Sequence, residues 1–119
     1  MERVELGTLE MDVILYPEDG RWIAQGLQFD ITASGVSPVE ASERFDQKVG
    51  AELVMSFEVG DEQPLAGVGH APQKFWTMFR EAKLTVEKET LSLRISAAGR
   101  VPRVRSRMKL TDERALVAA

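Results

Sequence analysis

The chain lacks several features on which common protein chemistries and locations depend. Its 119 residues include no cysteine, which excludes disulfide bonds, thiolate zinc sites and a cysteine nucleophile, and which fits a reducing compartment. No apolar run approaches the roughly 18 residues that a membrane span requires. Residues 1–5 do not have the basic-then-apolar form of a signal peptide. We therefore expect a cytoplasmic protein.

The sequence also has few residues that would support catalysis. Its one histidine, His70, lies in a loop rich in glycine and proline, with no second histidine and no cysteine to complete a metal pair. Gly67 and Gly69 are not followed by the third glycine of a dinucleotide-binding loop. Phosphate-binding-loop and nucleophile-elbow patterns are absent as well. We predict that the protein is not an enzyme and uses no cofactor or metal ion.

The charge of the chain, −4 overall, is unevenly distributed. Residues 1–99 contain 9 basic and 17 acidic residues, whereas residues 100–119 contain 6 basic and 2 acidic residues. An acidic body repels nucleic acid and attracts a basic partner, and a basic segment does the reverse. With a length typical of one domain, the sequence predicts a single domain over residues 1–96 and a loosely attached basic tail over residues 97–119.

Alternation of apolar and polar residues predicts a β-hairpin near the N-terminus. Met11, Val13 and Leu15 alternate with other residues in a run rich in strand-forming types. Residues 17–20, Pro-Glu-Asp-Gly, have the composition of a turn in which Pro17 presets φ at the first central position. Residues 22–27 are expected to return as the second strand, and residues 29–34 to form a short third strand.

A capping box predicts the start of a long helix. Ser37 occupies the N-cap position, Pro38 the first helical position and Glu40 the third. Gly60 is the expected end of the helix, and Gly35 is expected to provide a positive φ at the turn from strand to helix. Apolar residues recur at every fourth position and define one buried side, formed by Ala41, Phe45, Val49, Leu53 and Phe57.

The second half of the domain begins with a long loop over residues 60–73. Phe75, Trp76 and Phe79 share one face of a short helix, which suits a core or an oligomer interface, with an aromatic platform for nucleic-acid bases as the alternative. Alternation over residues 91–96 predicts a strand, which residues 84–86 begin or pair with. The expected fold class is α+β, with an antiparallel sheet, one long helix packed on one face, a short second helix and a C-terminal strand.

The stretch VILYPEDGRWIAQGLQFDITASGVSPVEA, residues 13–41, resembles the HicB-like family of antitoxin-type proteins. The resemblance covers roughly residues 11–58 and rests on a turn containing Asp-Gly, a strand with an aromatic residue, a single aspartate, a glycine and a Glu-Ala step at the helix start. These positions are Asp19, Gly20, Trp22, Ala24, Leu27, Asp30, Gly35, Glu40 and Ala41.

The resemblance implies a β-β-β-α core similar to a truncated ribonuclease H fold and association into dimers or higher oligomers. In many members of the family this domain covers a small basic RNA-cleaving toxin. Many members also carry a C-terminal DNA-binding segment, but no helix-turn-helix or ribbon-helix-helix pattern follows residue 58 here. A ribonuclease H-type metal site needs several convergent carboxylates, and the matching strands offer only Asp12 and Asp30, for which a surface strand or turn acid is the simpler interpretation.

The predicted partner-binding surface combines the acidic hairpin with its sheet and consists of Glu18, Asp19, Trp22, Gln25 and Asp30. Turn chemistry is the alternative for the two tip acids, and core packing is the alternative for the tryptophan. A second candidate surface is the basic tail, with Arg100, Arg103, Arg105, Arg107 and Lys109. These residues would contact phosphates, dock on a neighbouring subunit or remain solvated. Three functions stay open: a toxin-masking module, a stand-alone homo-oligomer, and a weak nucleic-acid binder.

Overall fold

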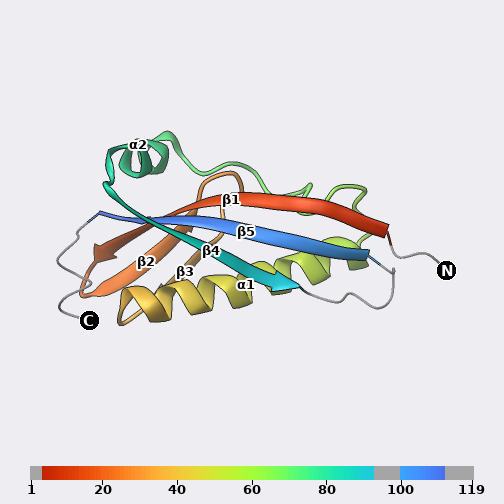
Figure 1. Ribbon diagram of the computed structural model, residues 1–119, viewed down its shortest axis with the longest axis horizontal. Helices are drawn as coiled ribbons and strands as arrows, with labels where there is room; N and C mark the ends of the chain where they lie inside the picture. The colour runs from red at the N-terminus through yellow and green to blue at the C-terminus, as the bar shows by residue number, and fades with distance from the viewer. Residues whose placement is uncertain (1–3, 93–99, 112–119) are drawn as a thin grey trace.

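The computed structural model describes residues 4–92 and 100–111, and within these ranges the side chains of residues 9–86 and 104–111. The elements in chain order are β1 (Val4–Glu18), β2 (Arg21–Gly26), β3 (Thr32–Gly35), α1 (Pro38–Glu58), α2 (Gln73–Glu81), β4 (Leu84–Ser92) and β5 (Arg100–Leu110). The strands form one sheet in the order β3-β2-β1-β5-β4, with α1 on one face and α2 on the other (Figure 1). The predicted α+β class is confirmed, including the long helix packed on one face.

The sheet is mixed, which corrects the prediction of a wholly antiparallel sheet. Pairings β1–β2, β2–β3 and β4–β5 are antiparallel, whereas β1 and β5 run parallel, from Val4 opposite Arg100 to Leu15 opposite Leu110. Strand β5 therefore lies in the interior of the sheet, between β1 and β4. The expectation of a loosely attached tail is wrong for residues 100–110, while residues 97–99 and 112–119 of that predicted tail lie outside the described residues.

The alternation of side chains explains why β5 belongs to the sheet. Val104, Met108 and Leu110 are buried in the core beneath α1, because every second residue of a strand faces the same side. Pro102 lies at the point where the β1–β5 pairing shifts register, opposite the residues between Glu5 and Thr8. Proline is tolerated at such irregularities because no ladder hydrogen bond is needed from it. Pro102 therefore marks a bulge within a strand and not the start of a tail.

Strand β4 also differs from its predicted bounds. It begins at Leu84 and ends at Ser92, so residues 84–86 start the strand. Residues 93–96, the last part of the predicted strand, lie outside the described residues. β4 forms one edge of the sheet, and the short strand β3 forms the other.

The β1–β2 hairpin turns at a different place from the one predicted. Its loop has two residues, Asp19 with φ +50° and Gly20 with φ +75°, and Glu18 pairs directly with Arg21. Two consecutive positive φ values are typical of the type I′ turn that Asp-Gly favours. Pro17 is part of β1 and pairs with Trp22, so the Asp-Gly dipeptide sets the turn and the proline does not.

The junction between β3 and α1 confirms the capping box. Ser37 Oγ accepts a hydrogen bond from the Glu40 backbone N–H at 3.1 Å, and Glu40 Oε1 accepts one from the Val36 N–H at 3.1 Å. Gly35 does not have a positive φ, contrary to expectation. A Cβ at this position would lie 2.6 Å from the Ala41 backbone nitrogen, so glycine is required because β3 approaches the first turn of α1 so closely.

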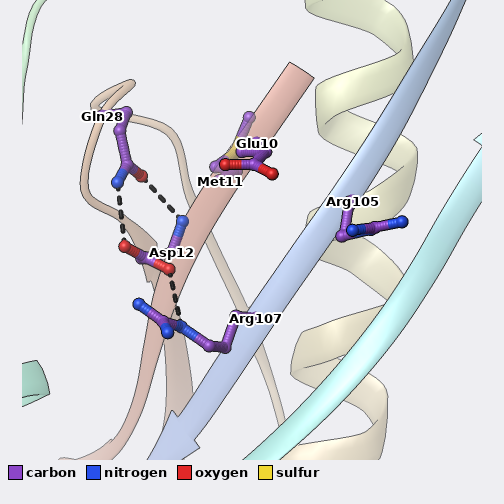
Figure 2. A pocket seen from close by; sticks show the side chains of 6 residues that line it. All are labelled: Glu10, Met11, Asp12, Gln28, Arg105 and Arg107. Carbon is purple, nitrogen blue, oxygen red and sulfur yellow. Dashed lines mark hydrogen bonds and ion pairs between the residues drawn. The ribbon is translucent and has the colours of Figure 1, made fainter. Parts of the chain in front are cut away.

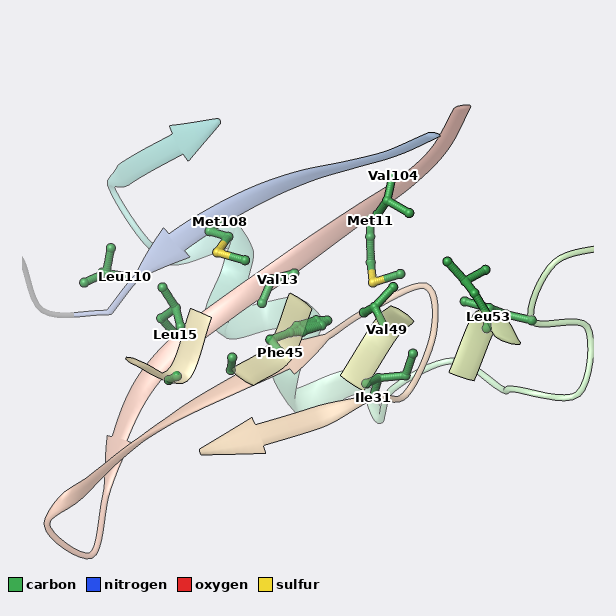
Figure 3. Close-up of a cluster of buried hydrophobic side chains, with 13 residues drawn as sticks. Met11, Val13, Leu15, Ile31, Phe45, Val49, Leu53, Val104, Met108 and Leu110 are labelled. Carbon is green, nitrogen blue, oxygen red and sulfur yellow. The ribbon is translucent and has the colours of Figure 1, made fainter. Parts of the chain in front are cut away.

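The main core lies between α1 and the sheet (Figure 3). Four of the five predicted helix positions are buried there, and the fifth, Phe57, is only partly buried. Ser56 is buried instead: its hydroxyl donates to Asp61 Oδ2 at 2.6 Å and accepts from the Leu65 N–H at 2.9 Å. This pair of hydrogen bonds holds the chain that leaves α1 and brings Leu65 into the core. The buried positions of α1 include Ala41, Phe45, Val49 and Leu53.

A second, smaller cluster lies on the opposite face of the sheet. Ile14 and Leu27 are buried there beneath Ala71 and Phe79, and Phe75 and Trp76 pack against them. The predicted apolar face of the short helix is confirmed. Neither of the two described helices is long and apolar enough to cross a membrane.

Candidate functional site

The structure does not gather the five predicted partner-binding residues on one patch. Glu18 and Asp19 are exposed at the hairpin tip, and Trp22 is partly buried against the main core on the α1 face. Gln25 and Asp30 lie near the other end of β2, where the chain turns toward β3. Only the two tip acids therefore form a common exposed group.

Gln25 belongs to a hydrogen-bond network inside the domain. It is 3% exposed, its Nε2 donates to Asp30 Oδ1 at 2.7 Å and to the Gly26 carbonyl at 2.9 Å, and its Oε1 accepts from Thr32 Oγ1 at 2.8 Å. Buried amides are stable only when their polar atoms are paired in this way. The network fixes the connection from β2 to β3, and it uses the carboxylate of Asp30 although that residue is exposed.

Arg105, Arg107 and Lys109 of β5 project from the face of the sheet opposite α1. Arg105 and Arg107 are exposed and Lys109 is half-buried, whereas the side chains of Arg100 and Arg103 lie outside the described residues. These positions alternate with Val104, Ser106 and Met108, which are buried on the α1 side. The described part of the predicted basic segment therefore forms a ladder of side chains on an interior strand of the sheet.

Asp12 of β1 links this ladder to the rest of the sheet. Its Oδ1 accepts from Arg107 Nε at 3.1 Å, its Oδ2 accepts from Gln28 Nε2 at 2.9 Å, and its backbone N–H donates to Gln28 Oε1 at 2.7 Å (Figure 2). A pocket of about 210 Å³ surrounds this network, with Glu10, Met11 and Arg105 completing its lining. Among the described residues, no group of three or more His, Cys, Asp or Glu is placed to hold a metal ion.

The pairing register places acidic residues on both sides of the basic ladder. On β1, Glu10 is opposite Arg105 and Asp12 is opposite Arg107. On β4, residues 89 and 87, both glutamates, are opposite the same two arginines. Opposite charges at facing positions of neighbouring strands stabilise a sheet by about 0.2–1 kcal/mol per pair. The register therefore places acidic positions of β1 and β4 on the two sides of the basic positions of β5.

A groove of about 400 Å³ separates α2 from β5. Lys109 Nζ lies 4.5 Å from the centre of the Phe79 ring, and Arg107 Cζ lies 5.4 Å from it. The Trp76 Nε1–H donates to the Ala71 carbonyl at 3.0 Å, which fixes the indole, and its ring lies 6.1 Å from that of His70. The lining consists of Asp12, Gln73, Trp76, Phe79, Arg80, Arg107 and Lys109.

This groove was not predicted, because no pattern in the sequence indicated that β1 and β5 are parallel neighbours. The basic segment and the aromatic helix were interpreted separately, and the structure places Lys109 and Arg107 beside Phe79. Arg80 and Gln73 join the groove from α2. The sequence pattern of the short helix was sufficient to place these two residues on its exposed side. It was not sufficient to place Arg107 and Lys109 of β5 beside them.

Tyr16 lies at the edge of the same face. Burial raises the pKa of its phenol above the ordinary value of 10.0, and the nearby Glu18 carboxylate raises the pKa further. Its ring centre is 5.8 Å from that of Phe75, so the phenol belongs to the smaller hydrophobic cluster.

A second unpredicted surface lies at the C-terminal end of α1. Val54, Met55 and Val59 are 37%, 58% and 75% exposed. Glu58 lies between them in sequence and is exposed, as is Glu62 just beyond the helix. These apolar residues fall outside the apolar repeat of α1, so they do not contribute to its core. We call these five residues the α1 patch.

Comparison of the chain with protein-family models found no matching family, and searches among curated proteins and among solved structures found no match either.

Proposed function

We propose that the protein is a non-enzymatic, HicB-like protein-binding module of the antitoxin type, which acts in the cytoplasm by sterically masking a small basic RNA-cleaving toxin. The order of β1, β2, β3 and α1 is the order that the sequence resemblance implies, and this agreement supports the proposal. The mechanism needs no catalytic group in this chain. It needs a surface that a basic protein recognises.

The observation that carries the proposal is the α1 patch. Exposed apolar side chains with charged neighbours are typical of protein interfaces, in which a desolvated apolar centre provides the affinity and a polar rim surrounds it. Residues 38–62, which include α1 and the segment after it, contain seven acidic and two basic residues. An acidic rim accelerates the approach of a basic partner and disfavours acidic ones.

This surface replaces most of the one expected from the sequence. Gln25 is buried and its amide is fully used inside the domain, and Trp22 is partly buried against the core, so these two residues offer less surface to a partner than the α1 patch does. Glu18 and Asp19 remain exposed, and they contribute to the general negative field that attracts a basic protein.

The test begins with the tagged full chain, recovered from native lysate in nuclease-treated and untreated halves. We expect a small basic protein in both halves, identified by mass spectrometry. The recovered partner should cleave RNA when separated, and an equimolar amount of this chain should suppress the cleavage. Recovery of the chain alone, at a fixed multiple of its own mass, would contradict the masking function and favour a stand-alone homo-oligomer.

A matched pair of variants then tests the surface. Met55→Lys places a positive charge in the α1 patch and should weaken the complex about tenfold or more, as expected for an apolar residue at an interface centre. Val39→Lys makes the same kind of change at an exposed valine near the other end of α1, 59% exposed, and should leave binding unchanged. Equal binding by the Met55→Lys protein would exclude the α1 patch as the interface.

A further inference from the structure

The groove between α2 and β5 has a charge opposite to that of the whole chain. Three cations, Arg80, Arg107 and Lys109, line it together with a single carboxylate from Asp12, which leaves an excess of two positive charges in a protein of net charge −4. Local fields of this kind concentrate anions where the remaining surface repels them. The lining of the groove therefore favours an anionic ligand.

Neighbouring groups hold the cations of the groove in position. Within the part of the chain that the structure describes, no carboxylate lies within ion-pair distance of Arg80 or Lys109. Lys109 and Arg107 lie over the ring of Phe79, a contact that orients a cation. Arg107 also donates from Nε to Asp12 Oδ1 at 3.1 Å, and Arg80 donates from Nη2 to Thr77 Oγ1 at 3.4 Å, so each guanidinium keeps further N–H groups for a ligand. Phe79 is 6% exposed, so it is a positioning residue and does not offer a face to a ligand.

Trp76 adds an aromatic surface beside these cations. It is half-buried, and its hydrogen bond to Ala71 fixes the orientation of the indole at the groove. An indole face stacks on a nucleic-acid base with little dependence on which base it is. Gln73 also lines the groove, one helical turn before Trp76 on α2. Its side-chain amide is able to donate to phosphate oxygens and to pair with base edges.

We infer that this groove binds a short segment of single-stranded nucleic acid, with phosphates contacted by Arg80, Arg107 and Lys109 and one base stacked against Trp76. A duplex presents no free base face, so the indole favours a single strand. The site is independent of the proposed masking function, because the α1 patch belongs to the helix on the other face of the sheet (Figure 1).

The first experiment uses Trp22→Phe in the full chain, which leaves Trp76 as the only tryptophan. Its fluorescence is followed during titration with oligothymidylate, thymidine monophosphate and a duplex of the same length. We expect quenching by oligothymidylate at low salt, with a slope of about −2 in the logarithmic plot of affinity against salt for three phosphate contacts. The mononucleotide shares the chemistry but offers one phosphate, and it should bind more weakly. Duplex binding as tight as that of the single strand, or no binding of the single strand, would overturn the inference.

Charge variants locate the binding. Lys109→Gln should weaken binding several-fold and reduce the magnitude of the salt slope by about 0.7. Asp12→Asn should strengthen binding, because it removes the one carboxylate of the groove and releases Arg107 from its ion pair. Arg44→Gln removes an exposed cation of α1 and serves as the matched control, with no change expected. Equal loss in Arg44→Gln and Lys109→Gln would show that binding is not at this groove, and so would unchanged or weaker binding by Asp12→Asn.

Discussion

The two faces of the sheet are covered by unequal amounts of structure. On one face, α1 has 21 residues and covers a cluster of 13 buried apolar side chains among the described residues. On the other face, α2 has 9 residues and covers a described cluster of four. The thickly covered face provides most of the apolar burial that stabilises the fold. The thinly covered face leaves room for the basic side chains of β5 and for the groove beside α2. We call the side of the sheet under α1 the thick face and the side under α2 the thin face.

The strongest way to test this difference is to remove the largest fully buried side chain of the main core beneath α1. Phe45→Ala deletes a ring that is 1% exposed and surrounded by both α1 and the sheet. We expect a loss of about 3–5 kcal/mol in the free energy of unfolding, the usual range for a fully buried phenylalanine. Urea denaturation followed by circular dichroism gives this value. A loss below about 1 kcal/mol would mean that α1 does not dominate the stability of the fold.

Phe79→Ala makes the same deletion on the thin face. The ring is 6% exposed and belongs to the smaller cluster, so we expect a loss of about 2 kcal/mol, below the range of a central core position. Hydrogen exchange should increase mainly over α2, because a weakly attached element opens without global unfolding. A loss equal to that of Phe45→Ala, with exchange raised over the whole sheet, would show that the two faces are equally important.

The helix ends provide a smaller contrast. Ser37 caps α1 through its side chain, whereas the residue at the N-cap of α2 is Pro72, which makes no side-chain hydrogen bond there. Ser37→Ala should lower the free energy of unfolding by about 1 kcal/mol. Differential scanning calorimetry of the variant against the parent chain measures this change. An unchanged midpoint would indicate that the packing of Gly35 and α1 fixes the helix start without the cap.

The smallest effect concerns pH on the thin face. Because the folded-state pKa of Tyr16 lies above 10.0, the unfolded chain loses its phenol proton first as the pH rises. The contribution of this group to stability is fully present below about pH 10 and is lost as the pH rises through the folded-state pKa. Tyr16→Phe should therefore lose less stability than the parent chain over that range.

Ultraviolet absorbance follows this ionisation directly, because Tyr16 is the only tyrosine of the chain. Titration of the folded protein should give a midpoint above that of a free phenol. A midpoint at the ordinary value, or identical alkaline stability of the parent and Tyr16→Phe proteins, would contradict the placement of the phenol in the smaller cluster.

Local patterns in the sequence were sufficient to predict most of the thick face. The capping box at Ser37 and the apolar residues at every fourth position up to Leu53 depend only on residues close together in the chain, and both are found in α1. The hairpin was predicted as well, although its turn is at Asp19 and Gly20. Each of these features depends on a few consecutive residues, so a short stretch of sequence is sufficient to predict it.

The thin face was less predictable because its contacts join distant parts of the chain. Arg105 and Arg107 were recognised as part of a basic segment, but the segment was assigned to a tail, whereas the structure places it on a strand with a register shift at Pro102. No local pattern states that Asp12 lies beside Arg107, and the groove depends on this neighbourhood. The α1 patch was missed for a related reason. Whether an apolar side chain of a helix is exposed, and which other exposed residues surround it, depends on the packing of the whole fold.

The position of β5 also determines when the fold can be completed. Its ion pair with β1 joins residues separated by 95 positions, and the parallel pairing runs along most of both strands. Contacts between such distant segments form slowly, because the chain must lose much of its freedom before the contacts stabilise it. During synthesis, β1 has a free edge until β5 emerges, and free edges favour pairing with other chains. Strand β5, the last of the described strands in the sequence, thus covers the edge of β1, while β3 and β4 remain the two edges of the sheet.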